Sequence, residues 1–287
     1  MSRPILIVMQ NANQDFSQNS HRHFQRTVWN YYHNHKRQGL PWRKTSSPYR
    51  IVVSELMLQQ TQVVRVIPKY QAFIKRFPNT KQLAAASQAD VIRYWQGLGY
   101  NRRAKYLHQC ARIVSIQYNG HWPKTLSNLK QLPGIGPYTA AAVMAFSYNQ
   151  PEVCLETNIR TAIIYHYFKE DFNVSENDLQ MIVKQTMDLD NPREWYWALM
   201  DYGAYIKPTY GNLNRQARSY TRQSQFKGSD RQIRGEIIRL LSKETFVTCE
   251  QVCKLGFTKK RVREQCINLC REGLIEEVTS DSFRLIT

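Results

Sequence analysis

The stretch LPGIGPYTAAAV, residues 132–143, joins a Pro-Gly-x-Gly turn to a helix start that is rich in small residues. Glycine has no Cβ, so Gly134 and Gly136 allow the main chain to approach another molecule closely. The N–H groups at the start of the following helix have no partner inside that helix, and with the helix dipole they attract anions. The stretch is therefore predicted to grip a phosphate, with an ordinary turn as the alternative.

The chain is strongly basic. Its 287 residues include 40 Lys and Arg against 22 Asp and Glu, which gives a formal net charge of +18. Such a surplus indicates a polyanionic partner, most simply nucleic acid, and a merely soluble basic protein is the alternative. No apolar run approaches the roughly 18 residues of a membrane span, and PILIVM at 4–9 lacks a cleavage signal. We expect an intracellular protein, cytoplasmic and nucleoid-associated, without a membrane partner.

In a chain this basic, the glycine turn and the helix after it favour a helix-hairpin-helix DNA clamp. The expected contacts are made by the main chain to the DNA backbone and do not depend on base sequence. The hairpin residues predicted to bind DNA are Pro133, Gly134, Ile135, Gly136 and Thr139.

Helical hydrophobic periodicity recurs along most of the chain, and alternating β-branched runs are few, so a mostly α-helical protein is predicted. Residues 1–24, rich in Asn, Gln and Ser, are expected to form a flexible leader, and residues 25–206 the core domain. Residues 207–229 carry five basic residues and no acid, which predicts a linker that lies along DNA.

Residues 230–287 are predicted to form a winged-helix domain. Helices are expected around 233–241, at 249–255 and at 258–272, followed by the hairpin-like LIEEVTSDSFRLI at 274–286. The third helix begins TKKRVR and would offer its cations to phosphates or a groove, with an ordinary solvated helix face as the alternative. These cations are Lys259, Lys260, Arg261 and Arg263.

The last four of the six cysteines follow the pattern C-x3-C-x12-C-x3-C. This pattern is similar to a metal site, but a spacing of four is also helical and places Cys266 and Cys270 beside Val262 and Leu269 on one apolar face. Core cysteines are predicted, and no metal site.

Five stretches, including the glycine turn, occur in a characteristic order: LPWR at 40–43, SPYRIVVSELMLQQTQV at 47–63, GLGY at 97–100, LPGIGPYTA at 132–140 and NPREWYWALMDYGA at 191–204. With them the chain resembles the MutY-type adenine DNA glycosylases of the helix-hairpin-helix superfamily, which also includes endonuclease III. The resemblance covers about residues 25–206. It implies a DNA glycosylase that acts on double-stranded DNA with a mispaired or damaged base.

The resemblance implies that Glu55 is the acid that protonates adenine, and that Gln59 and Gln60 probe the duplex and fill the gap left by the flipped base. Physical chemistry favours the same role for Glu55. Its apolar neighbours in the sequence include Val53 and Leu56, so desolvation should raise the pKa of its carboxyl group and keep that group protonated. A helix-face Glu in a salt bridge is the alternative.

The resemblance also implies an acid near C1′ of the sugar, where the family has Asp. Here LETNIRTA at 155–162 places Glu156 at that position, followed by Thr157 in place of a glycine and by the retained Asn158, which is expected to bind DNA. The extra methylene moves the carboxylate by about 1 Å, a shift that can cost about a hundredfold in rate. A catalytic Glu156 is expected, with helix capping as the alternative.

Tyr138 stands where endonuclease III has the lysine that forms a Schiff base with the sugar. A tyrosine cannot do this, so the resemblance implies hydrolysis without AP lyase activity. Tyr138 is expected to contact the sugar or the acid, and a packing role is the alternative.

Several family features are missing. The family normally carries an iron–sulfur cluster on four cysteines after the YGA-type helix, whereas residues 203–229 contain no cysteine. An enzyme with no cofactor is therefore expected. The Nudix-related domain that reads 8-oxoguanine in the family is not expected here, because residues 230–287 are predicted to form a winged helix instead, and Asn101 replaces the second tyrosine of GLGYY. Near Asn101, further DNA contacts are expected from Tyr100, Arg102 and Arg103.

These residues predict a monomeric, monofunctional glycosylase of base excision repair that releases adenine opposite G or 8-oxoguanine. Two alternatives stay open. The chain could instead release thymine or uracil from mismatches with G, or it could be a lesion-sensing DNA-binding protein that has lost catalysis.

Overall fold

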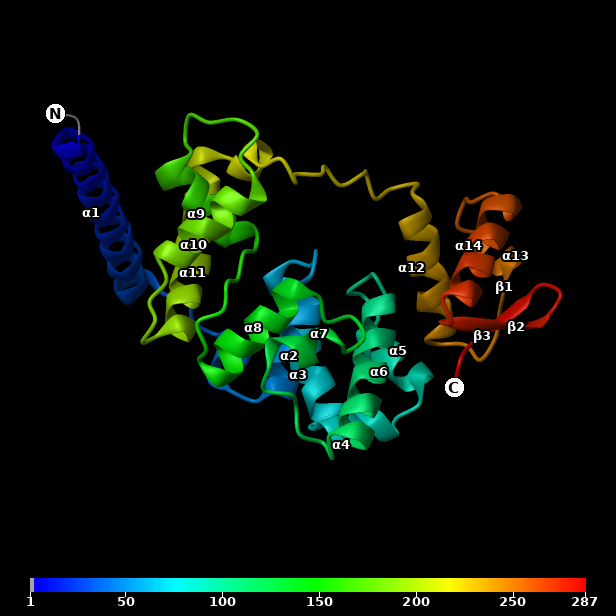
Figure 1. Cartoon of the computed structure of the whole chain (residues 1–287). Coiled ribbons are helices and arrows are strands. Elements are labelled where there is room, and N and C mark those ends of the chain that lie inside the picture. The colour runs from blue at the N-terminus through cyan, green and yellow to red at the C-terminus, as the bar shows by residue number, and fades with distance from the viewer. Residues whose placement is uncertain (1–2) are drawn as a thin grey trace. The chain divides into compact units, whose positions relative to one another are not determined.

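The computed structural model describes residues 3–287, with side chains from Gln18 onward. The chain forms two compact units, each built from two separate segments. The first unit comprises Met1–Leu40 and Ala140–Thr221, and the second comprises Pro41–Thr139 and Arg222–Thr287. Figure 1 shows that helices dominate the protein and that strands occur near the C-terminus. None of the described helices has the length and apolarity that a membrane span requires.

Among the described residues, the first unit contains five α-helices and a short 3-10 helix, and the helix α8 begins three residues before the second segment of this unit. Its elements are α1 (Arg3–His35), α8 (Pro137–Tyr148), α9 (Thr157–Tyr167), α10 (Glu176–Gln185), α11 (Pro192–Tyr210) and η2 (Leu213–Gln216).

The helix α11 packs against α9 at a point that admits only glycine. A Cβ built on Gly203 would lie 1.9 Å from the main-chain oxygen of Asn158. Glycine therefore allows the two helix backbones to approach closely. The same helix is tied to the end of α1, because Asp201 accepts hydrogen bonds from the main-chain N and from Nε of Arg37, at 2.9 and 2.5 Å. Gly203 and Asp201 of α11 thus hold α9 and the end of α1, respectively, against this helix.

The structure differs from the expected leader at residues 1–24, because α1 begins at Arg3. Phe24, Val28 and Tyr32 of this helix are buried, and Phe24 meets Trp195 edge to face. Tertiary burial therefore supports a helix that composition alone did not indicate. Met1 and Ser2, which also belong to the expected leader, lie outside the described residues.

The start of the predicted linker is folded onto the first unit. The helix α11 continues to Tyr210, and η2 follows at once. Asn214 is buried, and its amide donates to the carbonyl of Thr157 at 3.2 Å and to Oγ1 of Thr161 at 2.8 Å. A buried amide is stable only when its hydrogen bonds are made, so residues 211–217 lie fixed against α9 and do not form a loose linker.

The second unit begins with a helical bundle. It consists of η1 (Pro41–Lys44), α2 (Pro48–Leu58), α3 (Val63–Arg76), α4 (Thr80–Ala85), α5 (Gln88–Trp95), α6 (Arg102–Gln117) and α7 (Leu126–Lys130). Its core includes Phe73, Phe77 and Trp95, all fully buried. The helix α2 is buried along most of its length, which makes it a rigid support for the residues at its C-terminal end.

The second unit ends in a small domain of mixed structure. Its elements are α12 (Asp230–Leu241), β1 (Val247–Thr248), α13 (Cys249–Cys253), α14 (Lys259–Arg271), β2 (Ile275–Thr279) and β3 (Ser282–Leu285). The strands form an antiparallel sheet in the order β1-β3-β2. The three helices and the hairpin expected from the sequence are present, and the short β1 is an addition. The winged-helix assignment itself stays a prediction.

Three of the four cysteines of this domain, Cys249, Cys266 and Cys270, lie close to one another. Cys249 and Cys266 are buried, as expected for core residues, while Cys253 and Cys270 are half-buried. Burial raises the pKa of the Cys249 thiol to about 11, so the thiol is protonated and unreactive at neutral pH. Among the described residues, no group of His, Cys, Asp or Glu side chains is arranged as a metal site.

Candidate active site

Glu55 lies near the C-terminal end of α2, with its side chain facing the interior. Only 6% of the residue is exposed, and its neighbours Ser54 and Leu56 are buried as well. The hydroxyl of Tyr138 donates a hydrogen bond to Oε2 of Glu55 at 2.9 Å. The glycine turn is thus coupled to Glu55 through Tyr138, the second residue of α8.

Two glutamines follow directly where α2 ends. Gln59 is half-buried, and its amide donates to Oγ1 of Thr139 at 3.4 Å. Gln60 is exposed and has a positive φ of 53°, a conformation that residues other than glycine seldom adopt. The structure therefore brings Glu55, Tyr138, Gln59 and Thr139 together and leaves Gln60 facing solvent.

Two hairpin side chains expected to bind DNA are buried. Ile135 is 4% and Thr139 is 2% exposed. The Thr139 hydroxyl is also occupied by Gln59. These two side chains pack inside the protein and hold the hairpin in place. At positions 135 and 139 the hairpin can therefore contact DNA only through its main chain, and Pro133, Gly134 and Gly136 are available beside them.

The two glycines of the turn face different surroundings. Gly134 has φ +76°, and a Cβ there would lie 2.7 Å from Cβ of Tyr106, whereas a Cβ on Gly136 would meet nothing within 4 Å. Gly134 is therefore required by the fold of the protein itself. Gly136 is required only if another molecule approaches its backbone.

Alanine substitutions should separate these two requirements. We expect Gly134→Ala to lower the free energy of unfolding by about 1–3 kcal/mol, because it adds both strain and a clash. Gly136→Ala should change it by less than about 0.5 kcal/mol, yet weaken duplex binding about tenfold by obstructing one contact to phosphate. Thermal melting and a fluorescence binding titration check the pair. Unchanged affinity of Gly136→Ala would argue against close backbone contact.

Arg103, expected to contact phosphate, instead has an internal role. The residue is 7% exposed. Its Nη1 donates to the main-chain oxygens of Leu56, Met57 and Gln59, and its Nη2 donates to those of Leu98 and Gly99, at distances of 2.5 to 3.2 Å. Burial lowers the pKa of Arg103 to about 10, so the side chain keeps its charge at neutral pH. The prediction of a phosphate contact is therefore wrong for this residue.

The carbonyls that Arg103 binds explain its burial. The last carbonyls of a helix have no partner inside the helix and carry partial negative charge. Arg103 supplies donors to the end of α2 and, at the same time, to the loop that precedes Tyr100. One guanidinium thereby fixes the positions of the Gln59–Gln60 loop and of the GLGY loop relative to each other.

Replacing Arg103 should therefore damage both loops. Arg103→Met is expected to lower the free energy of unfolding by about 3 kcal/mol or more, since several buried carbonyls lose their donors. The control is Arg102→Met. Arg102 is exposed and donates to the Tyr106 hydroxyl at 2.7 Å, so its loss should cost less than about 1 kcal/mol. Urea unfolding of both variants provides the measurement, and equal effects would contradict the assigned role.

Asn101 is also largely enclosed. It is 9% exposed, and its carbonyl accepts the first hydrogen bonds of α6, from the N–H groups of Ala104 and Lys105. Its side chain is therefore not displayed on the surface as expected of a DNA contact. Tyr100, by contrast, is 41% exposed and has φ +47°, so this loop presents a strained, accessible tyrosine.

Glu156 lies in the first unit, immediately before α9. Its Oε1 accepts hydrogen bonds from the N–H groups of Asn158 at 2.8 Å and Ile159 at 3.0 Å, so the side chain caps α9. Burial raises the pKa of the Glu156 carboxyl above its ordinary value, against the two N–H donors and the charges of Arg37 and Arg160. Glu156 therefore has the capping role that the sequence offered as the alternative. The same two hydrogen bonds fix the direction of its carboxylate, and its catalytic role stays a prediction.

The cations at the start of α14 are only partly available to a ligand. Arg261 pairs with Asp230 at 2.6 Å, and Arg263 pairs with Glu277 at 2.8 Å. Lys259 lies 3.9 Å from Asp281 and is largely exposed, as is Lys260. The two lysines therefore fit the predicted DNA contact better than the two arginines do.

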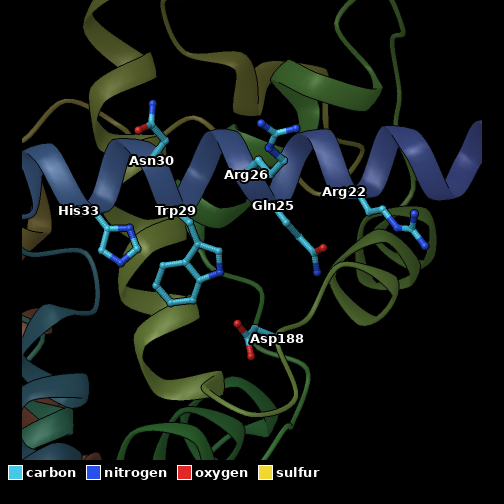
Figure 2. Close-up of a pocket in the computed structure, with 7 residues that line it drawn as sticks. All are labelled: Arg22, Gln25, Arg26, Trp29, Asn30, His33 and Asp188. Atoms are coloured by element: carbon cyan, nitrogen blue, oxygen red, sulfur yellow. The ribbon is translucent and has the colours of Figure 1, made fainter.

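One cavity of about 670 Å³ lies along α1 in the first unit, and Figure 2 shows its lining side chains. Trp29 is stacked on His33 with ring centroids 5.5 Å apart, and Gln25 donates to the carbonyl of Thr186. None of the candidate catalytic residues lines this cavity. The residues that do are Arg22, Gln25, Arg26, Trp29, Asn30, His33 and Asp188.

Comparison with known proteins relates this arrangement to DNA repair. Residues 53–185 match the HhH-GPD superfamily base excision DNA repair protein. The adenine DNA glycosylase of Mycolicibacterium smegmatis is 34% identical over 273 residues, covering 88% of this chain and 93% of that protein. That of Mycobacterium tuberculosis is 30% identical over 292 residues, covering 92% and 94%.

A shorter match is found with the adenine DNA glycosylase of Buchnera aphidicola subsp. Baizongia pistaciae. It is 36% identical over 187 residues, which are 64% of this chain and 52% of that protein. The chain therefore spans nearly the whole length of the mycobacterial proteins and about half of the Buchnera protein.

Solved structures show the same fold. A thermostable thymine-DNA glycosylase aligns with a TM-score of 0.61 at 24% identity, over 70% of this chain and 96% of that chain. An endonuclease III trapped in a covalent intermediate with DNA aligns with a TM-score of 0.55 at 14% identity, over 64% and 84%.

Proposed function

Since the chain belongs to the adenine DNA glycosylases of the HhH-GPD superfamily of base excision repair proteins, we propose that it hydrolyses the bond between adenine and deoxyribose where adenine lies opposite G or 8-oxoguanine. The hydrogen bond from Tyr138 to the buried Glu55 carries this proposal. In this hydrogen bond the Tyr138 hydroxyl orients the carboxyl group of Glu55, which lies just before the loop that contains the exposed Gln60.

The first step of the proposed reaction is protonation of the base. An enzyme cannot reach the bond inside the helix, so the adenine must first leave the stack. Glu55 then gives its proton to a ring nitrogen of adenine, and the electron pair of the bond to C1′ leaves with the base. The carboxylate that remains is buried but keeps the hydrogen bond from Tyr138, which supports the charge.

The second step needs negative charge near the sugar. Loss of the base leaves a positive charge shared by C1′ and the ring oxygen, and a fixed carboxylate stabilises it as in glycoside hydrolysis. We assign this role to Glu156, whose direction is set by the N–H groups of Asn158 and Ile159. Water then bonds to C1′ and gives its proton to the Glu55 carboxylate, which restores the acid and leaves an abasic site.

Two further properties form part of the proposal. Tyr138 has no amine with which to form a Schiff base, so strand cleavage at the abasic site is not expected. The residues that follow α11 do not fit an iron–sulfur cluster, because no cysteine occurs in 203–229 and buried Asn214 fastens this segment to α9. No step of the mechanism uses a cofactor.

We also propose contacts with a DNA duplex outside the active site. The hairpin residues Pro133, Gly134 and Gly136 are expected to hold the backbone of the damaged strand, and Arg102 and Lys260 to add phosphate contacts. A single chain supplies every group that the mechanism requires, so we propose a monomer.

Single-turnover excision on labelled duplexes tests the proposed function. The panel contains A opposite 8-oxoguanine, A opposite G, T opposite G, U opposite G and hypoxanthine opposite T, each followed by alkali to reveal abasic sites. Release of adenine is the expected result. Release of thymine or uracil without release of adenine would show that the substrate is a pyrimidine mispaired with G. Tight binding without release of any base would indicate a lesion sensor.

A further inference from the structure

Residues 222–231, which begin the second segment of the second unit and lead into α12, contact the Gln59–Gln60 loop and the GLGY loop of the same unit. The Gln223 amide donates hydrogen bonds to the Tyr100 hydroxyl and, at 3.3 Å, to Oε1 of Gln60. Arg231, at the start of α12, donates through Nη1 to the same Tyr100 hydroxyl at 3.2 Å. Side chains far apart in sequence therefore meet at Tyr100 and Gln60.

The two residues they meet have unusual backbones. Gln60 and Tyr100 have φ angles of 53° and 47°, and both are exposed. Strained conformations of this kind cost energy, and they persist mainly where surrounding structure fixes them, often at functional sites. Arg103 provides that support by donating hydrogen bonds to main-chain carbonyls of the Gln59–Gln60 loop and of the GLGY loop. The surface formed by Gln60, Tyr100, Gln223 and Arg231 is thus held in one arrangement.

This surface still has hydrogen-bonding capacity to offer. In the described part of the chain, Oε1 of Gln223 accepts no hydrogen bond and Nε of Arg231 makes none. Arg231 is held in place by the carbonyl of Ser224, which its Nη2 contacts at 2.6 Å. Arginine donors pair with the carbonyl at C6 and with N7 of guanine, and a glutamine offers one donor and one acceptor.

We propose that Gln223 and Arg231 read the base opposite the excised adenine, and that this base is a purine with a carbonyl at C6, namely guanine or 8-oxoguanine. The inference rests on the proposed function, because it identifies the partner of the same adenine. Asn101 is mostly buried, so the GLGY loop offers Tyr100 as its accessible side chain, and residues 222–231 supply the donors that select the opposite base.

Binding measurements test the inference separately from catalysis. Duplexes carry a 2′-fluorinated adenine nucleotide, which resists hydrolysis, opposite 8-oxoguanine, G, C or T. The wild-type protein is expected to bind the first two more tightly than the last two. Gln223→Ala and Arg231→Ala should reduce this preference about tenfold each, as expected for the loss of a base-specific contact. Tyr100→Phe, which removes only the shared hydroxyl, should reduce it as well.

Lys227→Ala is the matched control. Lys227 lies on the same segment, and within the described chain no hydrogen bond or ion pair joins it to either loop. Its loss should weaken all four duplexes by the same factor, as expected for a phosphate contact. The inference is overturned if Gln223→Ala and Arg231→Ala behave like this control, or if they tighten binding to every duplex, which would identify an obstructing segment. Failure of the wild-type protein to release adenine would instead refute the proposed function.

Discussion

Glu55→Gln is expected to slow adenine release by a factor of about 10² to 10⁴ while duplex binding is retained. Removal of a general acid typically costs this much, and glutamine has no proton to give to the departing base. Its amide has nearly the same size and can still accept the hydrogen bond from Tyr138. The fold and the DNA-binding loops should therefore be preserved.

Single-turnover excision and equilibrium binding on the same duplex measure this effect. Tyr138→Phe is the companion variant, since it keeps the ring and removes only the hydroxyl. A smaller loss is expected for it, because Glu55 remains but loses a group that orients it. Undiminished excision by Glu55→Gln would remove Glu55 from the role of the acid, and an unchanged rate in Tyr138→Phe would leave Tyr138 with packing alone.

Glu156→Gln is expected to reduce excision by about 10² to 10³ with little change in stability. Loss of one preorganised electrostatic group typically has an effect of this size. The glutamine oxygen can still accept from the N–H groups of Asn158 and Ile159, so α9 stays capped. The variant therefore removes the charge and keeps the cap.

Glu156→Ala provides the comparison, because it removes both the charge and the cap. It should lower the free energy of unfolding by about 1 kcal/mol more than Glu156→Gln does. If Glu156 only caps the helix, the glutamine variant will keep full activity and the alanine variant will differ in thermal melting alone.

The pH dependence of excision should carry the signature of Glu156. Because burial raises the pKa of its carboxyl, the ionised form that stabilises the sugar cation exists only above this raised value. Excision should therefore fall as pH drops through it. The contribution to folding has the opposite sign, since a group with a raised pKa in the folded state stabilises most at low pH and loses this contribution as pH rises.

The position of Glu55 could be predicted because the information is local. Val53 and Leu56 surround the acid in sequence, and in the folded chain the whole segment 51–57 is buried. The turn at Gly134 was predictable for the same reason. Two glycines and a proline define a local conformation whatever the rest of the chain does.

The role of Arg103 could not be predicted in this way. Its partners are carbonyl groups at the end of α2, and main-chain groups leave no trace in a pattern of side chains. Arg261 is a related case, because its carboxylate partner Asp230 lies 31 residues away in sequence. An arginine in a basic stretch is therefore a weak indicator of a phosphate contact until its own neighbours in space are known.

The helix α1 was missed because its stability is tertiary. Asn and Ser have modest helix propensity, and Phe24 is buried against Trp195, which lies far from it in the sequence. Gly203 is a similar case, since the sequence shows a glycine but not the carbonyl of Asn158 that excludes any larger residue.

The pairing of the first helix with α11 also sets an order of events on the ribosome. Arg37 and its partner Asp201 are 164 residues apart, and at about 5–20 residues per second their synthesis is separated by roughly 8–30 s. During that time Phe24, Val28 and Tyr32 belong to a nascent helix whose partners have not yet emerged. This face of the helix therefore stays without its partners until α11 has been made, and the first unit can close only after the bundle inserted between its two segments has been made.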